Sequence, residues 1–492
     1  MLTRSAGILM PISALPTQGG IGTLGKEAFA FADLLKAAGQ TYWQVLPVGP
    51  AGKGDSPYQP LSAFAGSELY IDLEQLAEDG LIDKIQLPTG ESGFVNYAAL
   101  RPARDKLLRQ AFAKFTPNGD YTSFVNENAF WLEPYALFMA IRGHYKGKEL
   151  CFWSAEDRAY TQSVRERYAP LYKDEIDYHK FLQYRFFTDW QRLRDYCHSN
   201  GIKLMGDMPI YVSPDGADVW MAPQQFELDE DYNPTHVAGV PPDCFSQTGQ
   251  RWGNPLYRWD VMGDDDYNWW CQRIRVASKL FDALRIDHFI GLARYWAIPA
   301  SSETAIKGRW RKGPGKRFID TITKAAGQMQ IVAEDLGLPH PSAKRLLKYS
   351  GYPGMKVMQF ELDEDAKPYA LTENCIIYGA THDNDTLAGW YKALPQKQRQ
   401  FVTDYIGAKS ANEVKNRLLR YGYASPCFLA IFQLQDVMWL GSSARMNIPG
   451  TPSGNWRWRM KKGTFDEQKI KMLKELSTLY GRNQQNGDKD GN

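Results

Sequence analysis

The chain has 492 residues, of which 43% are hydrophobic, so it can bury a large core as one barrel with insertions or as several ordinary domains. Lys and Arg total 58 against 56 for Asp and Glu, a formal charge of +2. No basic stripe or acidic tail favours nucleic acid or a membrane surface as a partner. The composition therefore favours a small neutral ligand.

The cysteines and the N-terminus bear on the compartment. None of the six cysteines forms a C-x-x-C pair, which is typical of reduced thiols rather than of a disulfide framework. The first apolar run is cut at Pro11 and again at Pro16, which makes it too short for a signal peptide. Nowhere do about 18 apolar residues follow one another. We expect a cytoplasmic protein without a membrane segment.

Taken in chain order, helical and strand-like patterns alternate. An amphipathic helix over 26–39 ends at a glycine, where a helix cap belongs. Strand-like apolar runs, most of them ending in polar residues, cover 41–49, 202–212, 283–289, 329–335, 354–360 and 375–385. Alternation of strands with helices argues for a parallel sheet.

The organisation of the chain follows from these patterns. We expect a single catalytic (β/α)8 barrel over 1–480, with insertions at about 75–200 and about 213–260. The first insertion reads as mainly helical. The second is rich in Gly, Pro, Asp and Trp and reads as irregular. Residues 481–492 are polar and are expected to be disordered.

Acidic residues end four of the predicted strands: Asp207, Asp287, Glu334 and Asp383. In a (β/α)8 barrel the strand ends converge on one rim, where the active site lies. An open doubly wound sheet also binds ligands at strand ends, but four convergent acids fit a closed ring better. Glu334 lies 47 positions after Asp287, and Asp383 lies 49 after Glu334, which leaves room for the intervening strand at 354–360.

A pair of these acids suits glycosidic-bond chemistry. Two carboxyl groups about 5–5.5 Å apart form a retaining pair, in which one attacks the anomeric carbon and the other protonates the leaving oxygen. Asp287 suits the nucleophile, because Arg285 lies on the same face of the strand and favours the charged form. Glu334 suits the general acid, and Asp383 would hold sugar hydroxyls. The alternative is that Arg285 and Asp287 form a buried ion pair without a catalytic purpose.

Parts of the sequence also match, incompletely, a metal site and a dinucleotide-binding loop. His288 and His382 each adjoin one of the acids, as metal ligands could, but no H-x-H, H-E-x-x-H or D-x-D-x-D pattern occurs, so we expect no metal. The segment 20–25 matches G-x-G-x-x-G, yet it follows Pro16 rather than a buried strand, and no acid ends the next strand. We therefore interpret it as a turn at a helix start.

Seven longer segments resemble, in order, the motifs of 4-α-glucanotransferases, the amylomaltase or disproportionating-enzyme family of the α-amylase clan. They are GDSPYQPLSAFAGSELYID (54–72), MGDMPIYV (205–212), GVPPDCFSQTGQRWGNPLY (239–257), LRIDHF (284–289), VAEDLG (332–337), ATHDNDT (380–386) and RMNIPGTPSGNWRWR (445–459). The resemblance spans nearly the whole chain. It implies a (β/α)8 barrel with inserted subdomains, no cofactor, and transfer of α-1,4-glucan segments between maltooligosaccharides.

The resemblance also assigns residues. It makes Asp287 the nucleophile, Glu334 the acid/base and Asp383 the transition-state stabiliser. The positions that it implies for substrate binding are Ser56, Tyr58, Asp207, Trp252, Arg285, His288, His382 and Asn447. Trp252 lies in a segment that resembles a mobile loop over the acceptor side. The alternatives are an α-glucan hydrolase and a carbohydrate-binding protein on an inactive barrel, which the intact acids disfavour.

Overall fold

The computed structural model describes residues 3–483, apart from residues 84, 86, 88–92, 243–245, 338–339 and 365–369. Most of the polar C-terminal segment, 484–492, lies outside the described residues. The packed chain continues past the expected boundary at residue 480, because Arg482 is fully buried. Its guanidinium group donates hydrogen bonds to the carbonyl oxygens of Ser5, Tyr423 and Cys427.

Eight parallel strands in the described part of the chain form a ring, as the predicted barrel requires. In order round the ring they are β1 (Ser5–Leu9), β2 (Tyr42–Gln44), β3 (Lys203–Met208), β6 (Ala283–Ile286), β9 (Gln330–Ala333), β10 (Gly354–Val357), β11 (Cys375–Tyr378) and β12 (Leu429–Gln433). The ring closes between β9 and β10, where the Ala333 N–H donates to the Pro353 carbonyl at 2.9 Å. The order along the chain is the order in space, as in a (β/α)8 barrel.

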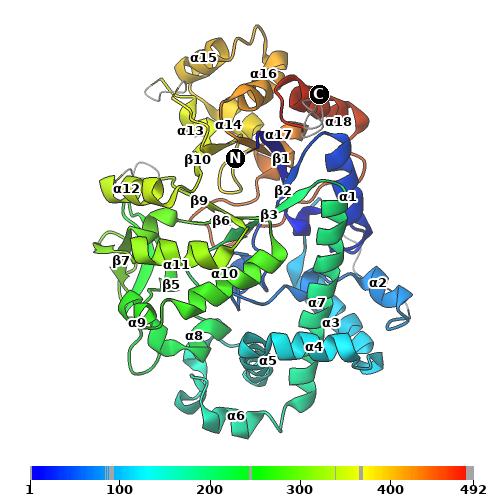
Figure 1. The fold of residues 1–492 in the computed structure, drawn as a ribbon, viewed down its shortest axis with the longest axis vertical. Helices are drawn as coiled ribbons and strands as arrows, with labels where there is room; N and C mark the ends of the chain where they lie inside the picture. The colour runs from blue at the N-terminus through cyan, green and yellow to red at the C-terminus, as the bar shows by residue number, and fades with distance from the viewer. Residues whose placement is uncertain are drawn as a thin grey trace, which may run out of the picture.

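Helices pack around this ring (Figure 1). They are α1 (Lys26–Ala37), α10 (Asn268–Leu280), α11 (Lys316–Ala326), α12 (Pro341–Ser350), α13 (Met358–Glu361), α14 (Leu387–Ala393), α15 (Gln396–Tyr405), α16 (Ala411–Ala424), α17 (Leu434–Met438) and α18 (Glu467–Leu479). The helix predicted over 26–39 is confirmed as α1. It buries Ala28, Phe31 and Leu35 on one face, and Gly39 follows it at φ +65°.

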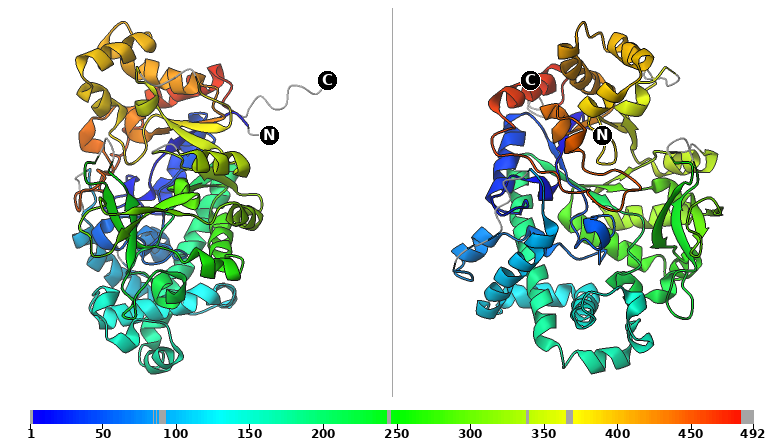
Figure 2. Two further views of the ribbon diagram at one scale, coloured as in Figure 1. Left: turned by 90° about the vertical axis from the view of Figure 1, so that its left-hand side faces the viewer. Right: turned by 180° about the vertical axis from the view of Figure 1, so that it is seen from behind.

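The long segment between β2 and β3 is helical. It contains α2 (Leu73–Glu78), α3 (Tyr97–Lys114), α4 (Gly119–Glu127), α5 (Ala129–His144), α6 (Gln162–Tyr168) and α7 (Lys173–Ser199). Figure 2 shows from two further sides that α4–α6 lie at the end of the molecule opposite α15 and α16. The 27-residue helix α7 leads from this end back to β3.

The segment between β3 and β6 is more regular than its composition indicates. Besides α8 (Ala217–Met221) and α9 (Trp259–Asp264), it supplies β4 (His236–Val240) and β5 (Gln250–Pro255). These pair with β7 (Arg294–Pro299) and β8 (Arg309–Lys312) in an antiparallel sheet of order β5-β4-β7-β8. The expectation of irregular structure there was wrong, because β4 pairs with a strand that lies beyond β6 in the chain.

Candidate active site

The four predicted acids do converge at the carboxyl ends of barrel strands. Asp207 lies in β3 directly opposite Arg285 of β6, and Ile286 at the end of β6 pairs with Ala333 at the end of β9. Asp287 and Glu334 are the residues that follow these two strand ends, so they stand side by side, on strands spaced about 4.8 Å apart. Asp383 follows β11 on the far side of β10.

The Glu334 carboxyl group is held by the backbone. The N–H of His288 donates to Oε2 at 2.7 Å, and the N–H of Leu336 donates to Oε1 at 2.8 Å. His288 has a left-handed backbone (φ +51°), and it lies at the turn between β6 and the short 3-10 helix that follows. The side chain is nearly enclosed, with the residue 7% exposed.

Burial raises the pKa of Glu334 to about 8, and the neighbouring Asp287 adds to this rise. Arg285 and the two backbone donors oppose it. A carboxyl group with this pKa is mostly protonated at neutral pH, so it can donate a proton. The rim thus holds one protonated carboxyl group, Glu334, close to an arginine, Arg285, that pairs with the carboxylate of Asp287.

Arg285 links two of the acids. Its Nη1 contacts both carboxylate oxygens of Asp207, at 2.7 and 2.9 Å, and its Nη2 lies 2.9 Å from Oδ1 of Asp287. Burial alone would lower the pKa of Arg285, but Asp207 and Asp287 raise it well above its usual range. The arginine therefore stays charged inside the barrel mouth.

The ion pair that the alternative expects between Arg285 and Asp287 is present at 2.9 Å, but the more deeply buried partner of Arg285 is Asp207. The Asp207 side chain is 0% exposed and has its oxygens occupied by Arg285 and by the Tyr58 hydroxyl, at 2.8 Å. The Asp287 side chain is 26% exposed and keeps a free side toward the rim. Asp207 and Arg285 were both expected to contact sugar, yet their burial suits them to position Tyr58 and Asp287.

Asp383 is held open to the rim by two neighbours. Asn447 Nδ2 donates to Oδ1 at 2.6 Å, and His382 Nε2 lies 3.3 Å from Oδ2, while 43% of the side chain remains exposed. Partial burial alone would raise the pKa of Asp383, but His382 and Asn447 hold it well below its usual range. Asp383 is thus a fixed negative charge.

The rings of Tyr58 and His382 stack on each other, next to Asp207 and Asp383. Their ring centroids are 4.8 Å apart at 20°, and the Tyr58 hydroxyl lies 3.4 Å from His382 Nδ1. Ser56 Oγ accepts the backbone N–H of Tyr58 at 3.2 Å, so it supports this loop. Burial would lower the pKa of His382, but Asp383 and Asp207 raise it.

Trp252 reaches the site from β5. Its ring meets the edge of His288 at a centroid distance of 4.9 Å and an angle of 89°. The segment that was expected to be a loop is a strand here, and residues 243–245 of it lie outside the described residues. Gln59 and Asn254 exchange side-chain hydrogen bonds of 3.0 and 3.3 Å, which join β5 to the Tyr58 loop.

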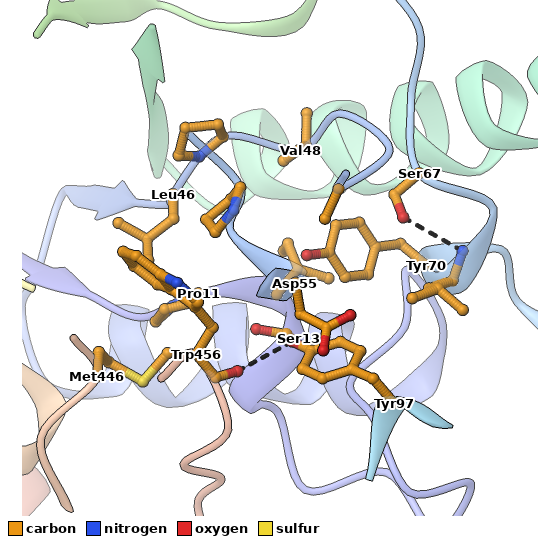
Figure 3. A pocket seen from close by; sticks show the side chains of 15 residues that line it. Pro11, Ser13, Leu46, Val48, Asp55, Ser67, Tyr70, Tyr97, Met446 and Trp456 are labelled. Atoms are coloured by element: carbon orange, nitrogen blue, oxygen red, sulfur yellow. Dashed lines mark hydrogen bonds between the residues drawn. The ribbon is translucent and has the colours of Figure 1, made fainter. Parts of the chain in front are cut away.

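Sequence reasoning did not single out Gln59, Asn254 or Trp456. Trp456 packs against Tyr58 and His382, with centroids 5.6 and 5.8 Å away. It also lines, with Asp55 and Tyr97, a cavity of about 20 Å³ that is shown in Figure 3. The only available signal was that all three residues lie within the long motifs, since each contact joins segments far apart in the chain.

Among the described residues, no three or more His, Cys, Asp and Glu side chains cluster in a way that could hold a metal ion. No helix in this part of the chain combines the length and the apolar character needed to cross a bilayer.

Comparison with known proteins agrees with this geometry. The family model described as 4-alpha-glucanotransferase matches residues 10–465. The chain belongs to this family. It is 41% identical to a 4-alpha-glucanotransferase of Thermus thermophilus, over 98% of this chain and 99% of the relative. It is 40% identical to the chloroplastic/amyloplastic 4-alpha-glucanotransferase of Solanum tuberosum, over 97% of this chain and 86% of that protein.

Solved structures of the family share the fold. The amylomaltase of Streptococcus agalactiae, solved in complex with acarbose, superimposes with a TM-score of 0.94 at 38% identity, covering 98% of this chain and 100% of the other. The amylomaltase of Corynebacterium glutamicum, at 17% identity, covers 96% and 75% with a TM-score of 0.76, which is a likeness of fold. The barrel and its inserted segments are thus those of a 4-alpha-glucanotransferase.

Proposed function

We propose that this 4-alpha-glucanotransferase moves α-1,4-glucan segments between maltooligosaccharides by a retaining double displacement. The observation that carries the mechanism is the pairing of Glu334, whose pKa is raised to about 8, with Asp287 on the neighbouring strand end. One group can donate a proton while the other, beside Arg285, can attack as a carboxylate.

In the first step Asp287 attacks the anomeric carbon of the donor, and Glu334 gives its proton to the departing glycosidic oxygen. The bond to the leaving sugar breaks, and a glycosyl ester forms on Asp287. In the second step the Glu334 carboxylate removes the proton from an acceptor hydroxyl, which attacks the anomeric carbon and releases Asp287. Two inversions restore the α configuration.

The surrounding residues fit supporting roles. Asp383, fixed by His382 and Asn447, suits contact with sugar hydroxyls and stabilisation of the positive charge that develops on the ring. Tyr58, which contacts Asp207 and His382, and His288, which adjoins Asp287, suit contacts with the donor sugar. These assignments rest on position and on charge.

Transfer to a sugar instead of to water needs an occupied acceptor site that excludes water. Trp252 suits this role, because it projects from β5 onto His288, which adjoins Asp287. Hydrogen bonds between the side chains of Asn254 and Gln59 join β5 to the segment that carries Tyr58, so the strand that carries Trp252 is fixed next to the site.

The test is a product profile from maltotriose alone, with Glu334→Gln beside the wild type. Longer maltooligosaccharides together with free glucose, absent in the variant, support transfer through the proposed pair. Glucose and maltose without longer products would indicate a hydrolase. No reaction, combined with measurable maltotriose binding, would indicate a carbohydrate-binding protein.

A further inference from the structure

Trp456 has a backbone conformation that its side chain disfavours. Its φ is +62°, in the left-handed region that glycine adopts readily. For a bulky side chain this conformation costs free energy, and it persists only where the surrounding contacts impose it. The residue is buried, at 6% exposure. Strain of this kind next to an active site calls for a reason in the surrounding contacts.

Contacts from two segments, one at Met446 and one at 95–97, hold Trp456 in this conformation. Its N–H donates to the Met446 carbonyl at 2.7 Å, and its carbonyl accepts the Tyr97 hydroxyl at 2.9 Å. The next residue, Arg457, pairs with Val95 through backbone and side-chain hydrogen bonds. Figure 3 shows Trp456 and Tyr97 joined at the cavity wall. The backbone is thus fixed on both sides of the indole ring.

The ring completes a three-membered aromatic cluster. Trp456 lies 5.6 Å from Tyr58 and 5.8 Å from His382, and those two rings stack on each other at 4.8 Å. The cavity of about 20 Å³ beside Trp456 is large enough for a water molecule. The indole therefore limits how far Tyr58 and His382 can turn.

The same segment also reaches Asp383. The Asn447 N–H donates to the His382 carbonyl at 3.1 Å, and the Asn447 side chain donates to Asp383. Because Trp456 pairs with Met446, the neighbour of Asn447, one loop fixes His382 from its backbone and from its ring. We propose that Trp456 is a positioning residue, which holds His382 against Asp383 and Tyr58 against Asp207 during glycosyl transfer.

The expected change in kcat rests on the proposed function, whereas the expected change in the pKa of His382 does not. The groups that face the His382 ring are Asp383, Asp207, Arg285, Tyr58 and Trp456. The two carboxylates raise the pKa of His382 and Arg285 lowers it. When the ring is free to leave Asp383, this pKa falls toward the ordinary value of about 6.5.

The experiment compares Trp456→Leu with Trp458→Leu. Trp458 is buried to the same 6% and lies two residues further along, and the structure gives its ring no contact with Tyr58 or His382. The His382 pKa is read by NMR titration of the imidazole, and kcat and KM are measured with maltotriose. Trp456→Leu should lower the His382 pKa and lower kcat about tenfold or more, with a smaller change in KM. Trp458→Leu should do neither.

Trp456→Phe keeps an aromatic ring, so it should recover most of both effects. If the leucine variant does not fold, Trp456→Gly removes the ring and suits the left-handed backbone, and it should show the same losses as the leucine variant. The proposal is overturned if the variant without the ring titrates at His382 like Trp458→Leu and keeps its kcat. A wild-type protein without transferase activity, but with the expected change in the His382 titration, would refute the proposed function and leave the positioning role standing.

Discussion

Arg285 and Asp207 form a doubly hydrogen-bonded pair, at 2.7 and 2.9 Å, inside the mouth of the barrel. Both hydrogen bonds come from Nη1 of the guanidinium group, so Nη2 is left for Asp287. The buried positive charge of Arg285 is thus paired with two carboxylates: Asp207, which is fully enclosed, and Asp287, the proposed nucleophile.

The first prediction concerns this pair. Arg285→Met leaves the buried Asp207 carboxylate without its charged partner, so it should lower the free energy of unfolding by about 3–5 kcal/mol. Asp207→Leu leaves Arg285 paired with Asp287 alone, so its loss should be smaller. The double variant should lose clearly less than the sum of the two. Urea unfolding of the four proteins measures this. Additive losses would mean that the two side chains do not stabilise each other.

The second prediction assigns the two displacement steps. Glu334→Gln should lower kcat by about 10²–10⁴-fold, because no proton can be given to the leaving oxygen. With an aryl α-maltoside as an activated donor, azide should restore turnover and yield the α-azide, since the ester on Asp287 still forms. Asp287→Gly with azide should yield the β-azide by a single inversion. The same anomer from both variants would contradict the assignment.

The third prediction is a pH profile. Glu334 with a pKa of about 8 is protonated below that pH, so kcat/KM should fall as pH rises through about 8. The initial rate with pH-stable maltooligosaccharides gives the profile. The first step with maltosyl fluoride, whose leaving group needs no proton, should lack this alkaline limb. A limb that persists with the fluoride would assign the titration to another group.

The fourth prediction concerns Trp252. Trp252→Ala removes the ring that lies against His288, so more glycosyl-enzyme should react with water, and the ratio of transfer to hydrolysis should fall. Free glucose measured against longer products gives the ratio. Trp310→Ala, on β8 of the same sheet and 36% exposed, is the matched control. An unchanged ratio in Trp252→Ala would remove this residue from the role.

Much of the barrel was predictable from local pattern. Six of its strands were expected from apolar runs, most of which end in polar residues, and the acids at four of them converge as expected. β1 and β12 were missed, because a short continuous apolar run such as LAIFQ does not distinguish a strand from a buried helix. The antiparallel sheet was missed because its strands pair across β6.

The sequence by itself indicated which acids lie near the carboxyl ends of barrel strands, since that depends on where each apolar run gives way to polar residues. Tertiary structure alone decided the partner of each acid. The burial that raises the pKa of Glu334, the enclosure of Asp207 and the ring of Trp456 behind His382 all come from segments distant in the chain. Desolvation and contact depend on what packs around a group, and no local pattern encodes that.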